Sequence, residues 1–271
     1  MEALSNQLFT WVTFAYMASA IAYLCMSVFK VQWPGRLGSW VAWVALGGHT
    51  LAIVLRWVGS YEKGYGHAPF SNLFESLVFF GWALCLVYLI IELRTGFKKA
   101  GVFAMPLVFA AMLYALGQDS AIKPLVPALK SNWLIAHVIT CFLGYAGFGI
   151  SAALSLLYLF GGGELSKPRT RAVLDNLIYQ SVVVGFLLLS AGIITGAIWA
   201  DVAWGRYWGW DPKEVWSLIT WLVYAAMLHM RFFKGWQGKT MAIFSLVGFG
   251  CVLFTYFGVN FWLSGLHAYV D

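Results

Sequence analysis

Eight long apolar stretches divide this chain, and each is long enough to cross a membrane as a helix. They cover residues 7–29, 38–58, 72–93, 101–117, 133–160, 177–200, 214–232 and 240–262. The fourth stretch is the weakest, because Pro106 interrupts it. Since 61% of the residues are hydrophobic and only 10% are charged, the sequence predicts an all-α, polytopic transmembrane helical bundle. We expect one integral membrane domain over residues 1–271, with the first apolar stretch retained as a helix.

The basic residues indicate which way the bundle faces. Eleven of the 17 lie in the loops after the first, third, fifth and seventh stretches. Cytoplasmic loops are enriched in Lys and Arg, so both termini and the loop over residues 201–214 are predicted on the non-cytoplasmic side. The location is then a bacterial cytoplasmic membrane or a thylakoid membrane. The net charge of +6 therefore reflects topology, and no binding to nucleic acid is expected.

Residues 201–214 hold an unusual density of aromatic side chains. Trp204, Tyr207, Trp208 and Trp210 lie within seven residues, separated by glycines. Flat rings bury a large area against a planar ligand at little cost in side-chain entropy. An interfacial belt of Trp and Tyr would explain one or two of these residues, but neither their density nor the Asp-Pro-Lys-Glu that follows. We therefore interpret this loop as a binding surface for a large planar ligand.

The end of the loop has the pattern of a helix start. Asp211 suits an N-cap, Pro212 suits the first helical position, and Glu214 completes a capping box. Such a cap would hold the aromatic loop rigidly at the start of the seventh span. Arg56, near the outer end of the second span, leaves two interpretations open: its guanidinium reaches the membrane interface, or it binds a carboxylate of the ligand.

Two histidines are predicted at the same membrane face as the loop. His137 lies about 6 Å into the fifth span, and His267 follows the end of the eighth. Two imidazoles beside an aromatic surface suit a porphyrin whose iron has one histidine on each side. We interpret His137 and His267 as axial ligands of haem. Arg206 and Lys213 join Arg56 as candidates to bind its propionates.

The other three histidines lie elsewhere. His229 is about 22 Å further along the seventh span than Glu214, which suits a second haem or a relay position. His49 lies near mid-membrane and could approach His229 if their helices are neighbours. His67, in the loop after the second span, could be a ligand, a gate or a solvated residue, and the solvated interpretation is slightly favoured. The four cysteines lie in different spans without Cys-x-x-Cys spacing, so we expect buried thiols and no redox pair.

At this level the chain resembles a known family. Residues 204–214 are similar to the WWD signature of haem-handling proteins in cytochrome c maturation, and the chain most resembles the CcsA (ResC) family of System II. The resemblance also rests on Gly66–Pro69, Ser71–Ser76, Trp133, His137, Ala197–Ala200, Leu218–Trp221, Leu228–Arg231, Tyr256–Asn260 and Gly265–His267. It extends over nearly the whole chain.

The resemblance implies a function in haem delivery and attachment. Haem b would cross the membrane past His229 and be held outside by His137, His267 and the WWD loop, where it is joined to the Cys-x-x-Cys-His motif of apocytochrome c. The implied partners are a separate CcsB (ResB)-like membrane protein, apocytochrome c and an external thiol-reducing protein. The chain would then be one subunit of a holocytochrome c synthase, or haem lyase, with no acid–base dyad of its own.

Three other functions compete with this interpretation. A CcmC-like protein would load haem onto a chaperone, but such proteins are shorter and lack the Gly-His-Ala-Pro to Asn-Leu-Phe-Glu segment. A b-type cytochrome would carry electrons, with its haem ligands stacked inside a helical bundle. A substrate transporter would need intramembrane carboxylates, and Glu75 and Glu92, near span ends, are the only candidates.

Overall fold

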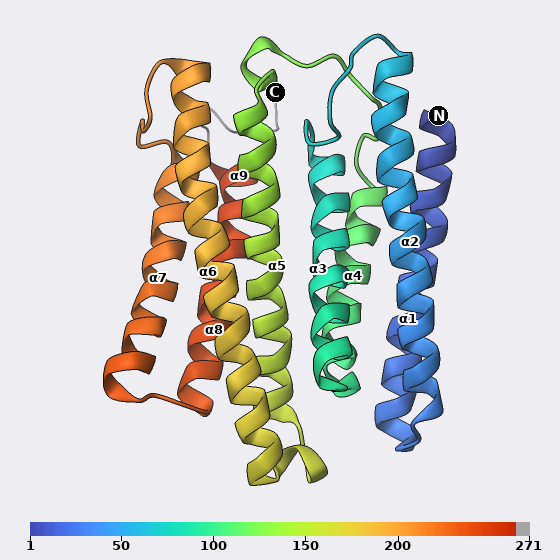
Figure 1. The fold of residues 1–271 in the computed structure, drawn as a ribbon, viewed down its shortest axis with the longest axis vertical. Helices are drawn as coiled ribbons and strands as arrows, with labels where there is room; N and C mark the ends of the chain where they lie inside the picture. Colours follow the sequence, from blue (N-terminus) through green and yellow to red (C-terminus); the bar gives the residue numbers. More distant parts are fainter. Residues whose placement is uncertain (264–271) are drawn as a thin grey trace. The chain divides into compact units, whose positions relative to one another are not determined.

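A computed structural model describes residues 1–263, and all regular elements in that range are helical (Figure 1). The prediction of eight spans is confirmed, because eight of the described helices are long and apolar enough to cross a membrane. The chain divides into two compact units, Met1–Lys130 and Ser131–Asp271. The two units are described separately below. The expectation of a single domain stays a prediction.

Unit 1 is a four-helix bundle in which consecutive helices are neighbours. Its helices are α1 (Glu2–Phe29), α2 (Trp33–Glu62), α3 (Leu73–Thr95) and α4 (Gly101–Leu116), with 3₁₀ turns η1 (Lys98–Ala100) and η2 (Pro127–Leu129). Helix α1 packs on α2 and α4, and α3 packs on the same two. Helix α4 is continuous through Pro106. The core is filled by Phe9, Tyr16, Leu77 and Leu84, which are fully buried.

Unit 2 has the same order of neighbours. It contains α5 (Asn132–Phe160), α6 (Pro168–Trp204), α7 (Pro212–Lys234) and α8 (Lys239–Leu253), together with the 3₁₀ turn η3 (Gly163–Ser166), the π-helical turn η4 (Phe254–Gly258) and the short α9 (Val259–Trp262). Helix α5 packs on α6 and α8, and α7 packs on the same two. The eighth predicted span is therefore interrupted by a π-turn, a feature that often marks functional positions.

Helix α6 differs most from its predicted span. It begins at Pro168 and ends at Trp204, whereas the apolar stretch covers residues 177–200. A helix can continue beyond its apolar stretch, because water solvates the polar side chains of its end turns. Hydropathy therefore predicts only the part of the helix that lies in the hydrocarbon core. As a result, Trp204 belongs to the last turn of α6, and the connecting loop is shorter than predicted, from residue 205 to 211.

Glycines bring α5 and α6 into close contact. A Cβ on Gly144 would lie 3.0 Å from the carbonyl oxygen of Gly185, and one on Gly147 would lie 3.2 Å from the Gly185 Cα. Nearer the C-terminal end of α6, a Cβ on Gly192 would clash with the Cys141 sulfur. Small residues allow membrane helices to approach backbone to backbone. This seam sets the position of every side chain that α5 directs at α6.

Candidate functional site

His137 is held against α6 by its own ring nitrogen. Its Nδ1 lies 2.8 Å from the carbonyl oxygen of Gly192, and a Cβ on Gly196 would lie 2.5 Å from the same nitrogen. Because a carbonyl can only accept, Nδ1 carries the proton and the lone pair of the neutral imidazole is on Nε2. That is the tautomer a metal-ligating histidine needs, and a backbone carbonyl is its usual orienting partner.

Aromatic rings connect His137 to the predicted loop. The imidazole is nearly parallel to the buried indole of Trp199, with ring centroids 6.0 Å apart and 20° between the planes. Trp199 in turn meets Trp204 at 4.8 Å, edge to face. The structure therefore brings His137, from α5, together with the end of α6 at which the loop begins.

The predicted capping box at the end of the loop is confirmed. The Asp211 carboxylate accepts from the backbone N–H of Lys213 at 3.1 Å, and Pro212 occupies the first turn of α7. Glu214 goes further than the motif requires, since its Oε2 accepts from the N–H groups of both Asp211 (3.1 Å) and Gly209 (2.8 Å). One carboxylate thus anchors two points of the loop to the start of α7.

Trp210 has a backbone conformation that is unusual for its size. Its φ is 57°, in the left-handed region, and its side chain is 71% exposed. An L-residue pays roughly 1–2 kcal/mol for this conformation, and burial of the ring offsets none of that cost. Such strain collects at functional positions.

The loop indoles do not form one flat surface. Trp208 and Trp210 meet at 5.8 Å with 89° between their planes, and the Tyr207 side chain is 60% exposed. A planar ligand can therefore lie flat on one of these two rings while the other presents its edge. The roles of Trp204, Tyr207, Trp208, Trp210 and Asp211 in binding haem stay predictions.

Two cationic side chains lie at this end of unit 2. The Lys213 ammonium donates to the side-chain oxygen of Asn260 at 2.8 Å, which ties the start of α7 to α9, just past the π-turn. The exposed Arg206 side chain lies against Gly209, where a Cβ would come within 2.7 Å of Nε. The roles of Lys213 and Arg206 in binding haem propionates stay predictions.

His229 is exposed on α7, and the other large side chains around it face outward too. Its ring packs on Phe233 with centroids 4.4 Å apart. Leu222, Phe232 and Phe233 are between 52% and 75% exposed. His229 lies 17 residues after Pro212, about 25 Å along the helix axis. It therefore belongs to the opposite end of α7 from the WWD loop, as the sequence predicts.

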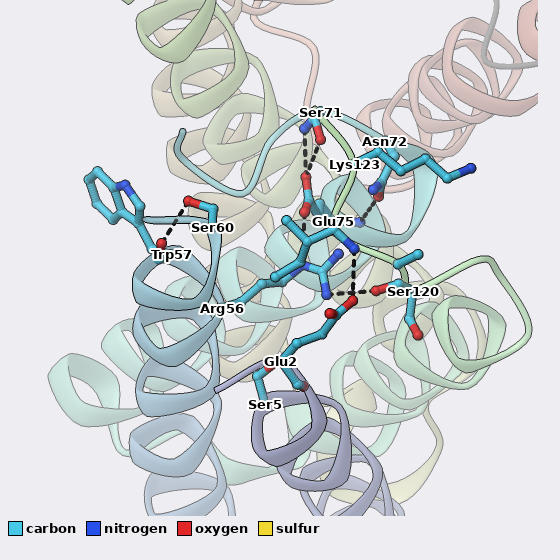
Figure 2. A network of polar contacts seen from close by, with 12 residues as sticks. Glu2, Ser5, Arg56, Trp57, Ser60, Ser71, Asn72, Glu75, Ser120 and Lys123 are labelled. Atoms are coloured by element: carbon cyan, nitrogen blue, oxygen red, sulfur yellow. Dashed lines mark hydrogen bonds and ion pairs between the residues drawn. The ribbon is translucent and has the colours of Figure 1, made fainter. Parts of the chain in front are cut away.

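Arg56 lies in unit 1, where its guanidinium makes an internal network (Figure 2). The side chain is 1% exposed, so it does not reach the membrane interface. Nε donates to Glu75 Oε1 at 2.8 Å, and Nη1 donates to the Ser120 carbonyl at 2.9 Å. Glu75 Oε2 accepts from both the backbone and the hydroxyl of Ser71, each at 2.7 Å. Among the described residues Nη2 has no hydrogen-bond partner, and a role in binding a ligand carboxylate stays a prediction.

The two remaining described histidines have structural surroundings in unit 1. His67 is buried, which contradicts its interpretation as a solvated residue. Its Nε2 lies 2.9 Å from the Lys123 carbonyl and its Nδ1 lies 3.0 Å from that of Ala68. His67 therefore links the loop after α2 to the loop after α4. His49 is fully buried, with Nδ1 3.1 Å from the Tyr16 hydroxyl, and it packs α2 against α1.

Sequence reasoning missed the residues that orient His137. Gly192 and Gly196 form a small-x-x-x-small pattern on α6, and that pattern is a known signal for close helix packing in membranes. The pattern does not indicate which side chain of the neighbouring helix packs against these glycines. The second predicted axial ligand, His267, lies outside the described residues. Of the four cysteines, Cys85 and Cys141 are buried as expected, whereas Cys25 and Cys251 are only partly buried.

Comparison with known families identifies the class of protein. The sequence model of the family described as "Cytochrome C assembly protein" matches residues 70–267, more than half of the chain. That span includes His137, the loop and His229. The fold and the site thus define a membrane protein of cytochrome c assembly.

Relatives narrow the assignment. The chain is 37% identical to the cytochrome c biogenesis protein CcsA of Pyropia yezoensis, over 99% of this chain and 98% of that protein. It is 41% identical to CcsA of Prochlorococcus marinus strain MIT 9515, over 81% and 79% of the two chains. It is 34% identical to CcsA of Gloeobacter violaceus, over 93% and 92%. The chain therefore belongs to the CcsA family of cytochrome c biogenesis proteins.

A solved structure shares the fold. The protein titled "Cytochrome c Heme Lyase CcmF" matches 94% of this chain with a TM-score of 0.71 at 17% identity. The match covers 46% of CcmF, so this chain spans about half the length of that protein. At this level of identity the similarity concerns the arrangement of helices alone.

Proposed function

We propose that the chain is the haem-handling subunit of a cytochrome c synthase, and that it presents haem b beside the WWD loop of unit 2. The observation that supports this most directly is the fixed tautomer of His137. A backbone carbonyl holds Nδ1, so the imidazole can bind iron through Nε2 without reorganising. The predicted His267 would supply the other axial ligand.

The residues around His137 can bind the other two parts of haem, which are its flat ring and its propionates. Haem is a flat apolar ring with two carboxylates at one edge. The exposed Trp210 ring offers a stacking face, while Lys213 and Arg206 offer cations for the propionates. Membership of the CcsA family of cytochrome c biogenesis proteins supports a role in handling haem.

The attachment step then depends on positioning. A cysteine thiol of apocytochrome c adds across a haem vinyl double bond: a C–S bond forms at one carbon and the proton goes to the other. No net electrons are exchanged, so the reaction requires only that the thiol be reduced, which is the task of the external thiol-reducing protein. Holding the vinyl edge next to the thiol supplies much of the rate by proximity.

His229 fits an earlier step that involves a second chain. It stands on the exposed surface of α7, about 25 Å from Pro212, and its ring packs on Phe233. A haem bound there from the membrane side would need its other axial ligand from a different protein. A CcsB-like partner packed against this face would provide that ligand.

The decisive experiment changes Gly196, against which the His137 ring packs, and keeps the histidine itself. In Gly196→Ala, the new Cβ would stand 2.5 Å from Nδ1 and push the ring off the Gly192 carbonyl. Because such orienting partners contribute on the order of 10–100-fold to metal affinity, we expect a comparable loss of outer haem. Absorption spectra of the chain purified with its CcsB-like partner, and the yield of holocytochrome c, measure the effect.

The matched control is Gly250→Ala in α8. Nothing lies within 4 Å of a Cβ at that position, so the substitution should leave haem content unchanged. His137→Gly supplies a second arm, in which added imidazole should restore the spectrum if the residue is a ligand. Normal haem and normal cytochrome c maturation in both Gly196→Ala and His137→Gly would refute the proposed function.

A further inference from the structure

A second candidate site lies in unit 1, at the end where α1 passes into α2 and α3 passes into α4. A cavity of about 450 Å³ opens there, lined by Arg36, Ser39, Trp40, Trp43, Leu93 and Lys98, with Glu92 at its base. Its volume is within the usual range for small-molecule sites. None of these residues takes part in the site of unit 2.

The base of the cavity is a rigid polar cluster. The buried Glu92 carboxylate accepts from the hydroxyls of Tyr23 (2.6 Å) and Tyr88 (2.5 Å). The Lys98 ammonium donates to Glu92 Oε1 and to the Ser39 hydroxyl, each at 2.6 Å. Since an ammonium has three N–H donors, these two bonds leave the third for an acceptor that enters the cavity. Lys98 is therefore fixed in place and presented to a ligand.

The rim carries a cation without an acidic partner. No ion pair among the described residues includes Arg36, and its side chain is exposed. This end of unit 1 holds five basic side chains, Lys30, Arg36, Arg94, Lys98 and Lys99, against the single carboxylate of Glu92. Glu92 already pairs with Lys98. The excess positive charge therefore favours an anion at the mouth of the cavity.

The outer walls are apolar and face away from the protein. Trp40 is 72% exposed and Leu93 is 74% exposed, and both lie on helices that qualify as membrane spans. Val44, one turn beyond Trp40, is 73% exposed. An apolar surface of this kind, running from a cationic mouth into the span, suits an amphiphile with an anionic head and long hydrocarbon tails.

We propose that this cavity binds an anionic phospholipid, with its phosphate between Arg36 and Lys98 and an acyl chain along Trp40 and Leu93. A basic pocket between membrane helices is a recognised way to bind anionic lipid heads. The lining includes no histidine, cysteine or methionine, so it offers haem no sulfur or imidazole ligand. The bound lipid would bridge α2 and α3, which make the sparsest contact between neighbours in unit 1.

The first test compares lipids on the unmodified protein. The full chain is purified in detergent, stripped of lipid, and supplied with phosphatidylglycerol or with phosphatidylcholine of the same acyl chains. Native mass spectrometry measures the lipid retained, and thermal unfolding measures the stabilisation that any ligand of the folded state provides. We expect preferential retention of phosphatidylglycerol and a higher melting temperature with it. Equal retention of both lipids would overturn the proposal.

The second test locates the lipid. Arg36→Gln should weaken the preference about fivefold, the effect of one basic residue at a membrane surface. Lys234→Gln, which removes an equal charge from an exposed position of unit 2, should not. Equal effects of the two variants would show general charge attraction and overturn the site. If Arg36→Gln does not fold, Arg36→Lys and Trp43→Ala replace it. Both substitutions change side chains that line the same cavity.

Two further arms distinguish other occupants. Glycerol phosphate carries the anionic head without the tails, so it should stabilise the protein much less than the lipid does. Equal stabilisation would mean that the apolar walls are not used. Haem is added in parallel, and a loss of haem uptake in Arg36→Gln without any lipid preference in the wild type would assign the cavity to haem and sink the lipid proposal.

Discussion

At the scale of single residues, the four described histidines differ in the contacts that their rings make. The sequence contains five histidines, and four of them lie in the described part of the chain. The structure gives these four different surroundings: Gly192 orients His137, His67 links two loops, His49 packs two helices, and His229 faces outward. The roles of His137 and His229 as haem ligands stay predictions.

Trp210 carries a prediction at this scale. Glycine adopts a positive φ without a Cβ penalty, so Trp210→Gly should be more stable than Trp210→Ala by about 1 kcal/mol. Both variants lose the indole, and both should retain less haem. Chemical unfolding in detergent and haem absorbance measure the two effects. Equal stability of the two variants would argue against strain at residue 210, and undiminished haem content would exclude the indole from the site.

At the scale of helices, polar side chains decide how the elements are joined. The capping box fixes the WWD loop to α7, and Lys213 fixes α7 to α9. In unit 1 the Arg56–Glu75 pair joins α2 to α3 and, through the Ser120 carbonyl, to the loop after α4. Close glycine packing joins α5 to α6, and the hydrogen bond between His137 and the Gly192 carbonyl adds a polar contact to it.

The Arg56–Glu75 pair allows a double-mutant cycle. Removing one partner leaves a buried charge uncompensated, so Arg56→Met or Glu75→Gln should each cost about 3–5 kcal/mol of unfolding free energy. The double variant should cost less than the sum of the two. The exposed pair Lys123–Asp119 is the control, and its disruption should have little effect. Strict additivity in the buried pair would mean that it contributes no coupling.

At the scale of the whole molecule, the chain provides exposed surface for other components. His229 and the phenylalanines beside it form an outward face on α7. Its predicted occupant is a membrane partner, and the location of the chain is the membrane itself.

A prediction about assembly follows from that surface. Without a CcsB-like partner, the isolated chain should hold no haem that depends on His229. With the partner present, His229→Ala should lose this inner haem while the outer haem at His137 is retained. Haem content per chain, measured with and without the partner, separates the two sites. Leu222→Ala, on the same helix, is the control for loss of surface area. An isolated chain that binds haem through His229 would contradict the need for a partner ligand.

Much of the fold could be predicted from the chain alone. Eight spans follow from the apolar runs, because backbone N–H and C=O groups in hydrocarbon must be hydrogen-bonded within a helix. The start of α7 follows from Asp211, Pro212 and Glu214, because helix capping depends on residues next to each other in the chain. The ends of α6 could not be predicted, because a helix continues wherever water solvates its polar turns. The WWD loop was recognised from its composition, although Trp204 proved to be helical.

The sequence by itself determined the eight membrane helices, the cap of α7 and the membership of the CcsA family, because each depends on residues close together in the chain or on their pattern. Tertiary structure alone decided that Arg56 pairs with Glu75, that His67 is buried, and that the carbonyl of Gly192 directs His137. Those contacts join residues 19 to 56 positions apart. They exist only because the packing of helices and loops brings residues that are distant in the chain within hydrogen-bond distance, and no local pattern encodes which ones will meet.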